Sequence, residues 1–122
     1  MIIEQIEALV RKGTVIPKPE AKADFVVKGW GVRRGERALV YLVPNHKDPS
    51  RPYEKGVTLS EFERAYQRVM SGEDFDRKWF EENMSACAAE GGCNFTTIGG
   101  LFQLLRIVEY ERGRYYRRET RT

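Results

Sequence analysis

Residues 1–43 combine a helical and a strand-like pattern of apolar positions. The first pattern predicts a helix closed by Gly13, with its apolar face formed by Ile2, Ile3, Ile6, Leu9 and Val10. Residues 14–16 predict a brief extended segment, and Pro17-Lys18-Pro19-Glu20 excludes a helix and predicts a stiff linker. Residues 25–43 are rich in β-branched and aromatic side chains on either side of Arg34-Gly35, so they predict a β-hairpin.

A long polar segment, residues 44–56, follows this hairpin. It holds three of the five prolines and the one histidine of the chain, His46. Connections inside a small domain are usually much shorter. We therefore expect this segment to be a loop that is either functional or mobile.

Two helices are predicted after this loop. Thr58 and Glu61 form the capping-box pattern T-x-x-E. The helix that they begin ends at Gly72, and its apolar stripe consists of Leu59, Phe62, Ala65, Tyr66 and Val69. Asp74 or Asp76 is the expected cap of a second helix, which carries Phe75, Trp79, Phe80 and Met84 before Gly91-Gly92 interrupts the chain.

A third helix and a second hairpin complete the pattern. Thr96 or Thr97 is the expected cap of the third helix, residues 97–106, whose apolar face consists of Ile98, Leu101, Phe102 and Leu105. Residues 107–118 turn at Arg112-Gly113 and predict a hairpin. The sequence thus predicts an α+β fold in a single domain, residues 1–122. It has an N-terminal helix, a β-hairpin, a three-helix segment and a C-terminal β-hairpin, and the two hairpins can share one small antiparallel sheet.

The order from residue 57 onward resembles a winged helix-turn-helix. Residues 97–106 correspond to the third helix and residues 107–118 to the wing, and the resemblance covers about half of the chain. It lies in the topology and implies a third helix that enters the major groove and a wing that contacts the phosphate backbone. The passage from Cys93 to Phe102 also resembles small bacterial proteins of mobile elements, such as integron cassettes, which implies no activity.

The charge distribution adds a candidate surface to this pattern. The chain has 21 Lys and Arg against 18 Asp and Glu, a net charge of +3, and the whole excess lies after Leu105. Arginine forks suit phosphate oxygens, and tyrosines stack or donate hydrogen bonds. We therefore predict that the wing contacts a nucleic-acid backbone through Arg112, Arg114, Tyr115, Tyr116, Arg117 and Arg118.

Recognition of base sequence has less support. The predicted third helix offers only Gln103, with Arg106 at its end, to base edges, so we expect weak sequence specificity. The first hairpin has a second basic tip beside Trp30, formed by Lys28, Arg33, Arg34 and Arg37. Of these, Arg33 and Arg34 are candidates for a second contact with a nucleic-acid strand. The alternative is that the third helix and Trp30 belong to the core and that the arginines are only solvated.

Two other functions stay open at this stage. A protein-interaction or adaptor domain would use the same scaffold without nucleic acid, and the apolar third helix favours it. A small ribonuclease-like toxin would draw on His46, Lys47, Tyr53 and the wing arginines. Because the chain has no second histidine and no evident activated nucleophile, we predict a binding protein that is not an enzyme.

No cofactor or metal is predicted. Cys87 and Cys93 are separated by five residues and have one distant histidine, so the paired spacing of a zinc site is missing and two thiols are expected. No membrane span is expected, since no run of 18 apolar residues occurs. The early acidic residues do not suit a signal peptide, which predicts a cytoplasmic protein. If the face formed by Ile2, Ile3 and Ile6 were incompletely buried, it would offer a homodimer contact.

Overall fold

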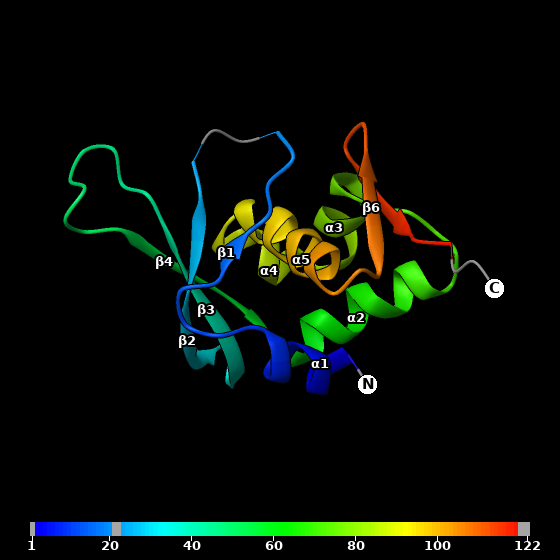
Figure 1. Cartoon of the computed structure of the whole chain (residues 1–122), viewed down its shortest axis with the longest axis horizontal. Helices are drawn as coiled ribbons and strands as arrows, with labels where there is room; N and C mark the ends of the chain where they lie inside the picture. Colours follow the sequence, from blue (N-terminus) through cyan, green and yellow to red (C-terminus); the bar gives the residue numbers. More distant parts are fainter. Residues whose placement is uncertain (1, 21–22, 120–122) are drawn as a thin grey trace.

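The computed structural model describes residues 2–20 and 23–119, which form an α+β fold of five helices and two antiparallel sheets. The strand order is β1-β2-β3-β4 in the first sheet and β5-β7-β6 in the second. Figure 1 shows the first sheet on one side of α2–α5 and the second sheet on the other. The elements are α1 (Ile2–Leu9), β1 (Val15–Ile16), β2 (Phe25–Arg33), β3 (Glu36–Val43), β4 (Tyr53–Thr58), α2 (Leu59–Met70), β5 (Phe75–Asp76), α3 (Arg77–Asn83), α4 (Ser85–Glu90), α5 (Cys93–Leu104), β6 (Val108–Glu111) and β7 (Arg114–Arg117).

Both predicted hairpins are confirmed, but they do not share a sheet. β2 pairs with β3 around Arg34-Gly35, and β6 pairs with β7 around Arg112-Gly113. All four turn residues have positive φ, which a two-residue turn of the type I′ class requires. The expectation of one shared sheet was wrong because residues 75–76, predicted as helical, form β5 and extend β7 instead.

The segment 44–56 is not a single loop, which corrects the prediction. Its last four residues, 53–56, belong to β4, an edge strand that pairs with β3 along its whole length. The strand is hard to recognise because an edge strand tolerates polar residues, here Glu54 and Lys55. The remaining loop, residues 44–52, extends away from the body of the molecule in Figure 1, and we call it the arm.

The capping box of α2 is confirmed. The Thr58 hydroxyl accepts a hydrogen bond from the Glu61 N–H at 3.3 Å, and the Glu61 carboxylate accepts one from the Thr58 N–H at 2.9 Å. Asp76, rather than Asp74, caps the next helix and accepts a hydrogen bond from the Trp79 N–H at 2.8 Å. The single helix predicted there is two helices, because Met84 between α3 and α4 has non-helical backbone angles.

α5 begins earlier than predicted and has no side-chain cap. Its first residue is Cys93, so Thr96 and Thr97 lie inside the helix, and Arg106 lies beyond its end. The N–H groups of Asn94 and Phe95 donate to the carbonyls of Gly91 and Gly92 at 3.1 and 3.2 Å. These bonds satisfy two of the first N–H groups of the helix, a task that the prediction gave to a threonine side chain.

One hydrophobic cluster joins the two halves of the chain. Ile2 and Ile6 of α1 are 2% and 0% exposed, and α1 packs against α2. Ile3, the third residue of that face, is only partly buried, so the homodimer contact stays a prediction. Trp30 is half-buried and packs against the edge of the cluster. Among the helices of residues 2–20 and 23–119, none is long and apolar enough to cross a membrane.

Candidate nucleic-acid interface

The register of the wing separates the predicted contact residues into two groups. Tyr115 points inward and is fully buried, with its ring 5.3 Å from that of Phe95 and 6.2 Å from that of Phe75. Its ring also covers Gly99, where an added Cβ would lie only 2.2 Å away. Side chains alternate across a strand, so Arg114 and Tyr116 lie on the opposite, outer face of the wing. Tyr115 therefore anchors the wing to α5 and does not join the other predicted contact residues at the surface.

Four of the predicted residues line one open cleft of about 550 Å³ between the wing and the segment that follows α2. We call it the wing cleft, and its lining consists of Gly72, Asp74, Arg114, Tyr116, Arg117, Arg118 and Glu119. Arg114 donates two hydrogen bonds to Asp74, at 2.9 and 3.0 Å, and its guanidinium lies 4.8 Å from the centre of the Tyr116 ring. The hydrogen bonds to Asp74 raise the pKa of Arg114. Arg114 is therefore held in place and partly neutralised.

Arg117 and Arg118 supply the cleft's remaining positive charge. The Arg117 guanidinium donates to the Met70 carbonyl at 3.2 Å, a neutral acceptor at the end of α2. Within residues 2–20 and 23–119, neither arginine forms a salt bridge. The cleft thus presents two exposed cations beside a tyrosine ring.

Arg112, Arg106 and Gln103 lie outside the wing cleft. Arg112 is exposed in the turn between β6 and β7, and Arg106 is exposed just after α5 with a φ of 61°. The Gln103 side-chain oxygen is buried without a hydrogen-bond partner among the described residues. The acceptor end of the Gln103 amide therefore does not face solvent, which limits its use as a base-reading side chain.

Most of α5 is enclosed by the rest of the protein, although Leu104 at its end is 42% exposed. Its buried residues include Ile98, Gly99, Leu101 and Phe102. The linker crosses it so closely that a Cβ added at Gly100 would lie 2.4 Å from the Pro17 carbonyl oxygen. A helix that inserts into the major groove needs one face that is exposed along the turns that contact the bases. In this structure the linker and the wing cover the faces of α5 that such insertion would need.

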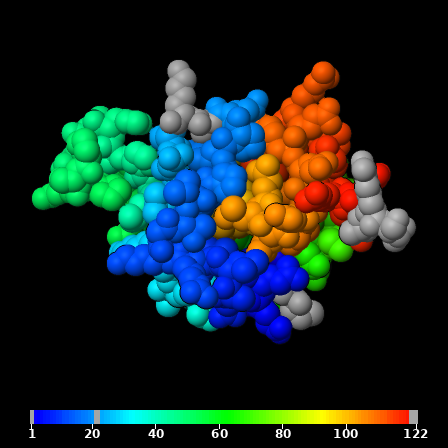
Figure 2. All heavy atoms as spheres, viewed as in Figure 1, coloured from blue at the N-terminus to red at the C-terminus, as the bar shows by residue number. Residues whose placement is uncertain are grey.

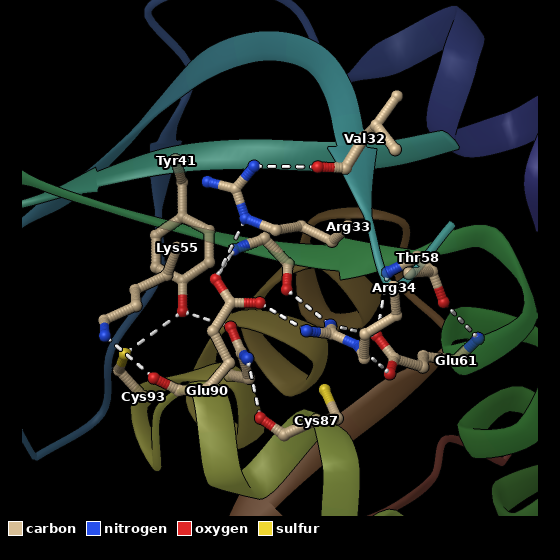
Figure 3. Close-up of polar contacts among 12 residues, drawn as sticks. Val32, Arg33, Arg34, Tyr41, Lys55, Thr58, Glu61, Cys87, Glu90 and Cys93 are labelled. Atoms are coloured by element: carbon tan, nitrogen blue, oxygen red, sulfur yellow. Dashed lines mark hydrogen bonds and ion pairs between the residues drawn. The ribbon is translucent and has the colours of Figure 1, made fainter. Parts of the chain in front are cut away.

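The basic tip of the first hairpin is engaged within the protein. Arg34 donates to the Glu61 carboxylate at 2.7 and 2.8 Å and also to Glu90, while Arg33 donates to Glu90 at 3.1 Å (Figure 3). Burial would raise the pKa of Glu61, but hydrogen bonds from Arg34 and the Thr58 N–H outweigh it, so that the pKa is lowered. We call Arg33, Arg34, Glu61 and Glu90 the hairpin network.

The hairpin network also closes the free edge of β4. Glu90 accepts a hydrogen bond from the Gly56 N–H at 2.9 Å, and Arg34 donates to the Gly56 carbonyl at 3.0 Å. Gly56 leaves room for the Arg33 side chain, because a Cβ there would lie 2.7 Å from its Cγ. Unpaired edge groups are a template for aggregation, so these side chains protect the sheet. The structure therefore gives Arg33 and Arg34 a structural role.

The two cysteines are free and lie in different surroundings. Cys87 is buried, and burial raises the pKa of its thiol. The Cys93 sulfur lies 3.2 Å from the Tyr41 hydroxyl, which also donates to the buried Asn94 side chain at 2.6 Å. In the part of the chain that the structure describes, no three His, Cys, Asp or Glu side chains gather as they would around a metal ion.

The residues considered for a ribonuclease lie in separate parts of the molecule. His46 and Lys47 belong to the arm and Tyr53 begins β4, whereas the arginines belong to the wing. Figure 1 shows the arm and the second sheet at opposite ends of the long axis. These residues are therefore not assembled into one site.

Comparison of the chain with protein-family models, with curated proteins and with solved structures found no match. The geometry of the site therefore carries the functional argument. Sequence reasoning did not identify the acidic partners of the candidate arginines. These are Asp74 in the wing cleft and Glu90 in the hairpin network. Their arginine partners lie 40 and more than 55 residues away in sequence, so no local pattern signals them.

Proposed function

We propose that this is a non-enzymatic binding protein that contacts the backbone of a nucleic acid through the wing cleft, with weak dependence on base sequence. The observation that supports it best is the grouping of Arg114, Tyr116, Arg117 and Arg118 in one cleft. Arginine forks match phosphate oxygens, and a fixed Arg114 beside two exposed arginines would follow a phosphate chain.

The topology around the cleft supports the same proposal. Helices α2, α3 and α5 together with the sheet order β5-β7-β6 are consistent with a winged-helix module in residues 57–118. The enclosure of α5 limits this module to contacts made by its wing. Since phosphate contacts position a protein without reading sequence, we expect similar affinity for duplexes of different sequence.

Fluorescence anisotropy with a labelled duplex tests the proposal. We expect binding at about 50 mM salt that weakens steeply as salt rises, because neutralised phosphates release counterions. The double variant Arg117→Ala/Arg118→Ala should bind about tenfold more weakly and reduce the salt slope by roughly two.

The matched control is Arg11→Ala/Arg64→Ala, which removes two exposed arginines elsewhere. It should bind like the wild type. Absence of an anisotropy change at low salt would contradict the proposal, as would equal losses in the two double variants.

A protein-interaction domain is the second candidate, and the enclosure of α5 favours it. A basic wing whose neighbouring helix is not exposed for base recognition can also dock onto an acidic protein surface. Pull-down after nuclease treatment separates the candidates. Retention of a partner that depends on Arg117 and Arg118 after complete nucleic-acid digestion would support this one.

A further inference from the structure

A second cavity lies on the inner side of the wing, next to the linker. It has a volume of about 280 Å³, and its walls come from the linker, α3, the first turns of α5 and the wing. In Figure 2 the blue atoms of the linker and the orange atoms of the wing rise on either side of the yellow-orange atoms of α5. We call this cavity the linker pocket, and its polar lining includes Lys18, Glu20, Arg77, Thr96 and Tyr110.

Lys18 is a cation on one wall of this pocket, and the carboxylate that acts on its charge, Asp24, lies outside the pocket lining. Its ammonium lies 3.2 Å from the centre of the Phe25 ring and donates to the Ala23 carbonyl at 3.0 Å. It forms no salt bridge within residues 2–20 and 23–119, and burial lowers its pKa. An ammonium held in this way gains from any anion that enters the pocket.

Arg77, at the start of α3, is the second cation. Its guanidinium lies 4.8 Å from the centre of the Phe95 ring and donates to the Gly92 carbonyl at 3.0 Å. In the described part of the chain it also lacks a salt bridge. Both contacts fix the guanidinium on neutral groups and leave its charge uncompensated.

The one carboxylate in the pocket lining, Glu20, does not neutralise both cations. It accepts a hydrogen bond from the Tyr110 hydroxyl, which draws it toward the wing. The lining therefore has two positive charges and one negative charge. A dianion would gain more here than a carboxylate, since both cations could bind it at once.

We infer that the linker pocket binds a phosphate monoester, with Arg77 and Lys18 on two sides of the phosphate. The volume lies just below the range of about 300–1,000 Å³ that is usual for small-molecule sites, so it suits a phosphate and a small attached group. Two sources share this chemistry, a small phosphorylated molecule and the terminal phosphate of a nucleic-acid strand. The site shares no lining residue with the wing cleft, and the inference does not depend on the proposed function.

Isothermal titration calorimetry with adenosine 5′-monophosphate, adenosine and inorganic phosphate tests the site on the full chain. We expect the monophosphate to bind and adenosine not to bind. Paired oligonucleotides with a 5′-phosphate or a 5′-hydroxyl distinguish the sources, because only a terminal-phosphate site prefers the phosphorylated strand. If none of the phosphate-bearing ligands binds, the inference is overturned.

Variants then locate the binding. Lys18→Met keeps an unbranched side chain beside Phe25 without the charge, and Arg77→Gln removes the second cation. Each should weaken monophosphate binding by about tenfold, the loss expected for one charge-assisted hydrogen bond. Glu20→Gln should strengthen binding, because it removes the competing carboxylate.

Lys78→Met is the matched control, an exposed neighbour of Arg77 outside the pocket lining. It should bind like the wild type, and so should Arg117→Ala/Arg118→Ala. Thermal melting followed by circular dichroism confirms that each variant is folded. Unchanged affinity in folded Lys18→Met and Arg77→Gln would overturn the inference.

Discussion

The two β-hairpins have the same Arg-Gly turn but use their arginines in opposite ways. At the first turn, Arg33 and Arg34 are tied to Glu61 and Glu90, and the hairpin is held to the helices by charge. The wing is held to α5 by the aromatic ring of Tyr115, and Arg117 and Arg118 stay at the surface. Arg114 of the wing is also tied to a carboxylate, Asp74, so the difference is that the wing has two further arginines, Arg117 and Arg118, that form no salt bridge within residues 2–20 and 23–119.

The largest effect is expected from breaking the charged attachment. Glu90→Ala leaves Arg33, Arg34 and the Gly56 N–H without their partner, and the carboxylate it removes is only 18% exposed. We expect a loss of about 3 kcal/mol in the free energy of unfolding. Urea denaturation measures it.

Glu54→Ala is the control for this prediction, since it breaks only the exposed ion pair with Lys28 on the same sheet. An exposed pair contributes less than about 1 kcal/mol. Equal losses in the two variants would show that the hairpin network is no stronger than a surface pair.

The next largest effect is expected from disturbing the aromatic attachment of the wing. Gly99→Ala places a methyl group against the Tyr115 ring, where the nearest atoms are 2.2 Å away. Overpacking of this kind typically costs about 2 kcal/mol. Hydrogen exchange should show the loss of protection concentrated in β6 and β7.

Gly92→Ala is the matched substitution, because a methyl group there meets only the terminal nitrogen of the exposed Arg77 side chain, at 3.2 Å. Its stability should stay close to that of the wild type. If Gly99→Ala left the protection of β6 and β7 intact, Tyr115 would not be the attachment of the wing.

The smallest effect is a pH dependence confined to the first hairpin. The pKa of Glu61 is lower in the folded protein than its ordinary value, chiefly through Arg34 once the opposing effect of burial is overcome. A carboxyl of this kind stabilises the fold above its unfolded pKa of about 4.3, and that stability is lost as the pH falls through the folded pKa. Glu61→Gln should therefore flatten the acid limb of the stability profile.

Urea denaturation between neutral pH and about pH 3 measures this difference. Glu63→Gln, an exposed neighbour on the same helix, should keep the slope of the wild type. A parallel profile for Glu61→Gln would contradict the role of the ion pair with Arg34.

Local patterns predicted the elements whose causes are local. The capping box at Thr58 and the two Arg-Gly turns depend on residues within four positions of one another, and all three are confirmed. β4 was missed because its polar residues are satisfied by distant partners, among them Glu90 for Lys55 and Gly56. Contacts between residues so far apart in sequence produce no periodic pattern of apolar and polar positions.

The candidate site was predictable in part for the same reason. The wing residues are contiguous, so their charge was visible, and alternation along β7 explains why Arg114 and Tyr116 lie at the cleft while Tyr115 does not. The enclosure of α5 depends on the linker, some 80 residues earlier in sequence. The apolar residues and paired glycines of α5 indicated that the helix is buried. They did not indicate that the linker covers it.

The contact between Pro17 and Gly100 also bears on how the chain folds. Synthesis releases the linker first, and its partner helix follows some 80 residues later. Ile16, which is 1% exposed in the folded protein, also contacts this helix at Gly100. Contacts between segments so far apart in sequence slow folding. The N-terminal segment is therefore expected to dock late and to be the part of the nascent chain with the greatest need for a chaperone.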